Sequence, residues 1–212
     1  MLYPLQLQTF TFGQHSISVY VPHLSAVQQA YEQGKKNNAQ TPLPYWAQVW
    51  PAALALSEFI HQHPHYIHNK TVLELAAGLG LPSLIAAHFA QHVTCTDYIE
   101  EAVEVTQQSA QHNALHNLCC RTLNWHHLPH DLAADVLLLS DVNYDPPEFE
   151  ILYKIIKGFV ERGTIVIIST PQRLMAKDFI SRLLPWCTLQ QQADVQHNGS
   201  AVPITIMILQ KV

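Results

Sequence analysis

The chain has 212 residues, of which 48% are hydrophobic and 13% are charged. This composition excludes a disordered chain, and the length suits one domain with a full core. The formal net charge is -5 and no basic run is longer than Lys35 and Lys36, which argues against a nucleic-acid partner. Apolar runs fall short of the roughly 18 residues of a membrane span, and no charged-then-apolar leader opens the chain. We expect a soluble, cytoplasmic protein with no membrane attachment.

The first 44 residues are interpreted as an N-terminal extension of a domain that spans 45–212. Hydrophobic and polar residues alternate through residue 22 on both sides of Gly13, which predicts a β-hairpin. A short helix near 25–32 and a polar loop follow. The aromatic stretch 44–51 then leads into an apolar helix that runs through Ile60.

From residue 72 onward, short apolar strands alternate with helices. Strands are expected at 72–75, 92–97, 121–125, 135–139, 164–169, 189–195 and 204–210, and helices at 81–90, 100–116, 147–160 and 171–184. This alternation predicts βαβ units and a mostly parallel sheet. The last two strands are joined too closely for a parallel crossover, so the last strand should run antiparallel. The fold class is therefore α/β and Rossmann-like.

A glycine loop at 74–80 follows the first strand of this series. Such a turn lets a ligand approach the backbone closely. Its spacing differs from the G-x-G-x-x-G dinucleotide fingerprint, since no third glycine follows Gly80, and no Walker lysine follows either. The carboxylate of Glu74 could orient a cationic ligand directly or through water. Asp97 ends the next strand, about 20 residues on, where a carboxylate holds a ribose diol in nucleotide-binding folds. A sulfonium cofactor fits this combination.

The chain resembles the seven-strand protein-lysine methyltransferases of methyltransferase family 16, which include the enzymes that methylate electron-transfer flavoprotein β and chaperone-type ATPases. The resemblance covers roughly 40–212. It rests on the aromatic stretch 44–51, the loop 74–80, Leu123-Asn124-Trp125, and Ser140 to Tyr144, which resembles a D-x-x-Y signature. Two positions depart from the family pattern. Ala76 replaces the first glycine of the loop, and Asn124 stands where many relatives have Asp.

The resemblance implies a seven-strand methyltransferase sandwich that uses S-adenosyl-L-methionine and releases S-adenosyl-L-homocysteine. Candidate cofactor-binding residues are Trp50, Glu74, Ala76, Ala77, Gly78, Gly80, Asp97, Tyr98, Asn124, Trp125 and Ser140. Asp141 would hold the acceptor amine and Tyr144 would shape its channel. No metal ligands are expected, because the histidines of 61–68 lack a nearby cysteine or carboxylate and indicate a surface loop.

The expected activity is N-methylation of a lysine side chain in a protein substrate. Three other interpretations stay open: a small-molecule N-methyltransferase, a non-catalytic S-adenosylmethionine-binding module, and a dinucleotide-dependent oxidoreductase, which the missing third glycine weakens. Asp141 could instead cap a helix, with Tyr144 in the core. The oligomeric state is left open.

Overall fold

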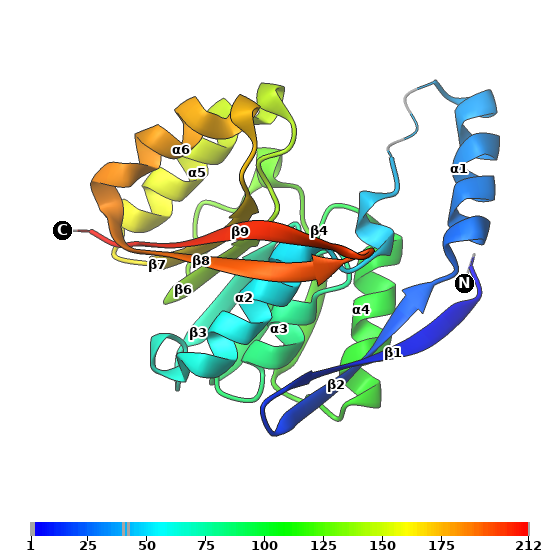
Figure 1. The fold of residues 1–212 in the computed structure, drawn as a ribbon, viewed down its shortest axis with the longest axis horizontal. Coiled ribbons are helices and arrows are strands. Elements are labelled where there is room, and N and C mark those ends of the chain that lie inside the picture. Colours follow the sequence, from blue (N-terminus) through cyan, green and yellow to red (C-terminus); the bar gives the residue numbers. More distant parts are fainter. Residues whose placement is uncertain (1–2, 40, 42, 212) are drawn as a thin grey trace.

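A central seven-stranded sheet organises the described residues, which are 3–39, 41 and 43–211 of a computed structural model (Figure 1). The strands are β1 (Leu5–Phe12), β2 (His15–Pro22), β3 (Thr71–Leu75), β4 (His92–Asp97), β5 (Leu118–Thr122), β6 (Val136–Ser140), β7 (Ile165–Pro171), β8 (Cys187–His197) and β9 (Ser200–Leu209). The α-helices are α1 (Leu24–Asn37), α2 (Pro51–Gln62), α3 (Leu81–Ala86), α4 (Glu100–His112), α5 (Phe149–Glu161) and α6 (Lys177–Leu183). Short 3-10 turns are η1 (Tyr45–Ala47), η2 (Pro64–Tyr66), η3 (Trp125–His127), η4 (Pro146–Glu148), η5 (Leu174–Ala176) and η6 (Leu184–Trp186).

The strand order of the large sheet is β5-β4-β3-β6-β7-β9-β8. The first five strands of this order are mutually parallel, whereas β9 pairs antiparallel with both β7 and β8. The expected α/β class and the antiparallel last strand are confirmed. The chain moves outward from β3 to β5 and then returns to β6 on the other side of β3. The carboxyl ends of β3 and β6 therefore form a topological switch point, where open α/β sheets bind ligands.

Helices cover both faces of the sheet, which explains why its central strands are apolar throughout. In β6, Val136 and Leu138 join the buried cluster under α2, α3 and α4, whereas Leu137 and Leu139 join the cluster under α5 and α6. Alternate side chains of one strand thus stabilise two separate layers. The two groups of helices lie on opposite sides of the sheet in Figure 1.

The hairpin β1–β2 forms a separate two-stranded sheet that docks on α4. The amide of Tyr20 donates to Ser109 Oγ at 2.9 Å, and Asn113 exchanges hydrogen bonds with the backbone of Ser18 at 3.0 and 2.7 Å. Ile17 and Val19 are fully buried in the same cluster as α2 and α3. The hairpin expected at the N-terminus is confirmed, and its inner face shares the core of the main sheet.

Three element boundaries differ from the expectation. The first helix continues to Asn37, because Lys35 and Lys36 favour its last turn. The strand expected at 121–125 is β5, Leu118–Thr122, because its pairing with β4 begins at Leu118 and the chain turns at Asn124 to enter η3. The helix expected at 171–184 begins only at Lys177, because Pro171 still pairs with β9.

Two smaller differences concern α3 and α4, which end at Ala86 and His112, before the expected 90 and 116. All four cysteines are free; Cys95 is buried, and Cys119, Cys120 and Cys187 are partly buried. Within the ranges that the structure describes, no helix combines the length and apolar character needed to cross a membrane.

Candidate active site

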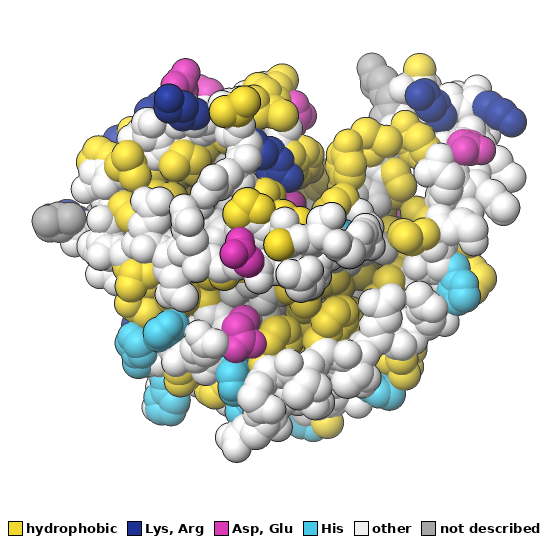
Figure 2. Space-filling model, in the orientation of Figure 1, with side chains coloured by type: hydrophobic (Ala, Val, Ile, Leu, Met, Phe, Trp, Pro, Cys, Tyr) yellow, Lys and Arg dark blue, Asp and Glu magenta, His cyan; other side chains and the backbone are white. Residues whose placement is uncertain are grey.

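Two adjoining cavities lie at the carboxyl ends of β3, β4 and β6, at the switch point of the sheet. Their volumes are about 310 Å³ and 270 Å³. Both are lined by Ala76, Tyr98, Val142 and Tyr144, so they are two halves of one cleft. Together they fall within the roughly 300–1,000 Å³ typical of ligand pockets. Figure 2 shows a hollow between α6 and the segment that joins α1 to α2, with hydrophobic side chains (yellow) on its walls.

The glycine loop forms the floor of the larger cavity and adopts left-handed backbone at alternate positions. The φ angles are 54° at Ala76, 55° at Gly78 and 66° at Gly80. A Cβ at Gly80 would lie 2.5 Å from Thr106 Cγ2 and 2.9 Å from Cys95 Sγ, so this position requires glycine. Ala76 adopts a conformation that L-residues disfavour, which explains physically why a glycine suits this position.

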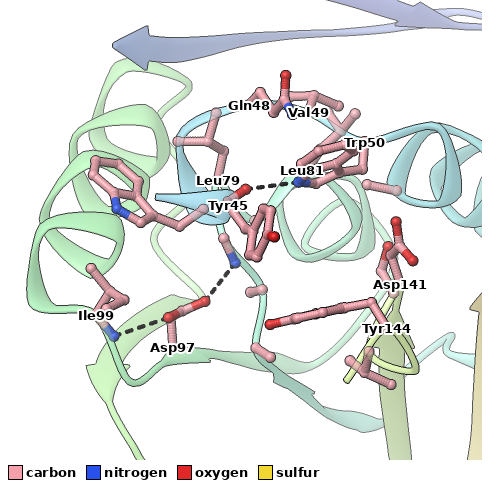
Figure 3. Close-up of a pocket in the computed structure, with 18 of the residues that line it drawn as sticks. Tyr45, Gln48, Val49, Trp50, Leu79, Leu81, Asp97, Ile99, Asp141 and Tyr144 are labelled. Atoms are coloured by element: carbon pink, nitrogen blue, oxygen red, sulfur yellow. Dashed lines mark hydrogen bonds between the residues drawn. The ribbon is translucent and has the colours of Figure 1, made fainter. Parts of the chain in front are cut away.

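Asp97 fixes this loop and also faces the cavity (Figure 3). Its Oδ2 accepts a hydrogen bond from the Gly78 amide and its Oδ1 accepts one from the Ile99 amide, both at 2.9 Å. Thr106 Oγ1 donates to the Gly78 carbonyl at 3.1 Å, so both backbone groups of Gly78 are held by side chains. Burial raises the pKa of Asp97, and its backbone hydrogen bonds oppose that shift. Asp97 is thus an ordered acceptor at the cavity wall.

Glu74 lies beneath the loop, fully buried, rather than in the lining of the cleft. Its Oε2 accepts hydrogen bonds from the Ser83 amide at 3.0 Å and the Ser83 hydroxyl at 2.5 Å. Its Oε1 is buried and has no hydrogen-bond partner among the described residues. Burial raises the pKa of Glu74 to about 8, although the Ser83 hydrogen bonds act in the opposite direction. The carboxyl group joins the loop to α3.

Aromatic side chains cross the cleft above the loop. Trp50 Nε1 donates to the Tyr45 carbonyl at 2.7 Å, and the Tyr45 ring lies 6.2 Å from the Trp50 ring and 5.4 Å from the Tyr144 ring, centroid to centroid. Tyr144 reaches across the cavity toward Asp97 in Figure 3. Burial, followed by the nearby Tyr98 and Asp97, raises the pKa of Tyr144 to about 12. The phenol therefore stays protonated at neutral pH.

Asp141 stands on the wall opposite Asp97, directly after β6 (Figure 3). Its φ is 54°, and its amide donates to the Ser169 carbonyl at 2.9 Å. Arg173 Nη1 donates to Asp141 Oδ1. Arg173 lies just after β7, and sequence reasoning missed it by assigning that segment to a helix. The signal that could have revealed it is Pro171, because a strand that ends there leaves the next residues at the same sheet edge as Asp141.

The smaller cavity is bordered by η3, which follows β5. Asn124 caps this turn, because its Oδ1 accepts from the His126 amide at 2.9 Å. Trp125 Nε1 donates to Glu148 Oε2 at 2.8 Å, and His126 Nε2 lies 2.9 Å from the same oxygen. His126 and Glu148 both line this cavity, and sequence reasoning did not select Glu148. Asn124 Oδ1 keeps a second lone pair for a ligand donor.

The structure gathers most of the expected site residues in the cleft. The lining includes Trp50, Ala76, Ala77, Gly78, Gly80, Asp97, Tyr98, Asn124, Trp125, Ser140, Asp141 and Tyr144. Over the described part of the chain, no group of three or more His, Cys, Asp or Glu side chains is placed to hold a metal ion. Of the histidines in 61–68, His61 turns toward the hairpin, where its ring centroid lies 5.3 Å from that of His15.

Residues 40–185 match a family model described as lysine methyltransferase. The chain belongs to this family. Human METTL23, named a histone-arginine methyltransferase, is 31% identical over 137 residues, which cover 62% of this chain and 72% of that protein. The electron transfer flavoprotein beta subunit lysine methyltransferase of Danio rerio is 32% identical over 140 residues, which cover 65% of this chain and 54% of that protein.

The lysine methyltransferase family membership agrees with the fold. The N-methyltransferase NodS of Bradyrhizobium japonicum, solved with S-adenosyl-l-homocysteine, matches with a TM-score of 0.62 at 11% identity, over 84% of this chain and 98% of that one. This likeness shows the fold alone. Among the first relatives matched, the chain spans from 53% to 72% of the relative's length.

Proposed function

We propose that this protein is an S-adenosylmethionine-dependent N-methyltransferase that methylates a lysine side chain of a protein. The observation that carries the proposal is the single cleft that contains both Asp141 and Tyr144 on one wall and the loop with Asp97 on the other. This arrangement would bring an acceptor nitrogen and a cofactor together at the switch point of the sheet. Family membership supports the same reaction.

The residues of the cleft fit the cofactor on two observations. A nearly buried carboxylate, Asp97, faces the cavity, as ribose hydroxyls require. The glycine loop beside it exposes backbone rather than bulky side chains. In this proposal Trp50, Ala77, Tyr98 and Ser140 contact the cofactor's sides. Asn124 and Trp125, in the smaller cavity, hold its adenine.

For Glu74 we propose an indirect role. Its carboxyl group lies under the loop and positions Ala76 to Gly80 through Ser83. The buried Oε1 has no partner among the described residues, and in the protonated carboxyl group it carries the proton, which a water could accept. Glu74 would therefore act on the cofactor mainly by fixing the shape of the loop.

The cofactor supplies a methyl group on a cationic sulfur. The acceptor nitrogen must present a lone pair, so a lysine has to release its proton to solvent water before transfer. When bound, the cofactor would supply this methyl group to the nitrogen; the nitrogen–carbon bond would form as the carbon–sulfur bond breaks, and the positive charge would pass from sulfur to nitrogen. Asp141 accepts a hydrogen bond from the amine and stabilises this new charge, while Tyr144 and Tyr45 exclude water.

The partner is a protein substrate rather than a nucleic acid in this proposal, because the net charge is -5. The proposed location is the cytoplasm, since the four cysteines are free and reducing compartments keep thiols in that state. The boundary between the N-terminal extension, 1–44, and the methyltransferase domain, 45–212, also remains a proposal.

The test separates cofactor binding from transfer with two variants. Asp141→Asn should abolish transfer from labelled S-adenosylmethionine while leaving its dissociation constant, measured by calorimetry, within about threefold. Asparagine also tolerates the left-handed backbone at this position. Asp97→Ala should weaken cofactor binding by about 5- to 150-fold, because it removes hydrogen bonds worth on the order of 1–3 kcal/mol. Binding of NAD, or loss of cofactor affinity in Asp141→Asn, would contradict the assignment.

A further inference from the structure

Arg173 makes the acceptor side of the cleft asymmetric. Its guanidinium donates to Oδ1 of Asp141, while Asp141 Oδ2 has no partner among the described residues. The Asp141 side chain is only 10% exposed and that of Arg173 is 25% exposed, so both groups are largely shielded from bulk water. Both residues also line the larger cavity. One carboxylate oxygen is thus committed inside the protein, and the other is available to a ligand.

The guanidinium is held in place by a second contact on the same loop. Arg173 Nη1 also lies 3.4 Å from Asn143 Oδ1, and Asn143 is almost fully buried. The Thr170 hydroxyl donates to the same Asn143 oxygen at 2.5 Å. The ends of β6 and β7 are therefore joined by a network in which Arg173 contacts two acceptors, and its position does not depend on Asp141 alone.

We propose that Arg173 is a positioning residue that sets this acceptor site for lysine and against arginine; the inference rests on the proposed function. An incoming guanidinium binds a carboxylate best through both oxygens, in a fork. Arg173 already takes one oxygen of Asp141, so a second guanidinium cannot form that fork. A lysine nitrogen needs only a single acceptor, which Oδ2 provides.

The positive charge of Arg173 also favours lysine over arginine as the methyl acceptor. A cation beside the acceptor site disfavours the protonated form of an entering amine. Lysine can respond by losing its proton and becoming the nucleophile, whereas arginine stays protonated in proteins. This distinction matters here because family membership points to lysine, while the human relative METTL23 is named a histone-arginine methyltransferase.

The first experiment measures which amino acid receives the methyl group. Wild type, Arg173→Ala and Arg173→Lys are incubated with labelled S-adenosylmethionine and lysate of the source organism. The protein is then hydrolysed, and methyl-lysine is separated from methylarginine. Arg182→Ala is the matched control, because Arg182 forms an ion pair with Glu150 on the exposed surface. We expect methyl-lysine from wild type and control, at least a tenfold lower methyl-lysine to methylarginine ratio in Arg173→Ala, and partial rescue in Arg173→Lys.

The second experiment measures the preference without turnover. Butylammonium and butylguanidinium are titrated by NMR into each variant saturated with S-adenosyl-L-homocysteine. Wild type should prefer butylammonium, and Arg173→Ala should bind butylguanidinium at least tenfold more tightly than wild type does. Equal butylguanidinium affinity in the two proteins, or methylarginine as the main wild-type product, would overturn the inference. A wild type that discriminates between these probes but labels no protein would instead contradict the proposed function.

Discussion

Ala76 offers a direct test of the strain in the glycine loop. Its φ of 54° lies in the left-handed region, which costs an L-residue roughly 1–2 kcal/mol. Ala76→Gly removes that cost. It also introduces about 0.4–1 kcal/mol of chain entropy in the unfolded state and removes one partly buried methyl group. The net stabilisation of the single variant should be small, about 0–1 kcal/mol.

A matched control isolates the conformational contribution. Ala77 is the next residue and also half-buried, but its φ is not positive. Ala77→Gly adds the same entropy and removes the same methyl group, so these contributions cancel between the two variants. The difference in unfolding free energy should therefore be roughly 1–2 kcal/mol in favour of Ala76→Gly. For a chain of this size that corresponds to roughly 2–8 °C in Tm.

The assay is urea unfolding without cofactor, followed by the fluorescence of the four tryptophans. Calorimetry with S-adenosylmethionine serves as a second readout, because Ala76 lines both halves of the cleft and loses only a methyl group. Affinity should be no weaker than in wild type. If the two glycine variants were equally stable, the backbone at Ala76 would carry no strain and this reasoning would be refuted.

Two further predictions concern Glu74 and the rim of the cleft. Burial raises the pKa of Glu74 to about 8, so the folded state keeps a proton that the unfolded state loses, and stability should fall as pH rises from about 4.5 to 8. Urea unfolding at pH 5 and pH 8 should show that this pH dependence lowers the unfolding free energy of wild type by up to roughly 5 kcal/mol. Glu74→Gln should remove the decrease, and an equal decrease in both proteins would contradict the raised pKa of Glu74. Leu174 is 94% exposed beside Arg173, so Leu174→Ser should leave stability within about 0.5 kcal/mol yet raise KM for the protein substrate. The control is Leu24→Ser on α1, where the leucine is 57% exposed; it should alter neither quantity, and equal KM values for the two variants would contradict a contact between Leu174 and the protein substrate.

The sheet could be predicted because each central strand carries its own signal. Leu137, Leu138 and Leu139 are apolar on both faces, and such a run indicates a strand covered on both sides. Two boundaries were wrong because pairing between distant segments overrides the local pattern. Leu118 enters β5 because it pairs with Val93, and Pro171 stays in β7 because it pairs with Ile204. Neither pairing can be seen in a short window of sequence.

The residues of the site likewise include some that the sequence could predict and some that it could not. Asp97 and Asp141 could be selected because Asp97 ends β4 and Asp141 directly follows β6, and the ends of parallel strands meet at one edge. The burial of Glu74 under the loop could not be predicted, because it depends on Ser83 turning back as α3 begins. Arg173 was missed because its partner lies 32 residues earlier, on a neighbouring strand. Contacts between strand ends require the sheet order, which composition and periodicity do not contain.

Left-handed backbone at a non-glycine residue occurs on both sides of the cleft. Ala76 and Asp141 share a φ of 54°, and they follow β3 and β6, two strands that pair in parallel. Such backbone persists only where the surroundings over-determine it. At Asp141 the amide bond to Ser169 and the ion pair with Arg173 supply that constraint. Arg173 therefore stabilises the turn that aims the carboxylate, as well as occupying one of its oxygens. A variant that removes the guanidinium should consequently loosen the acceptor side of the cleft while leaving the glycine loop, held by Asp97, in place.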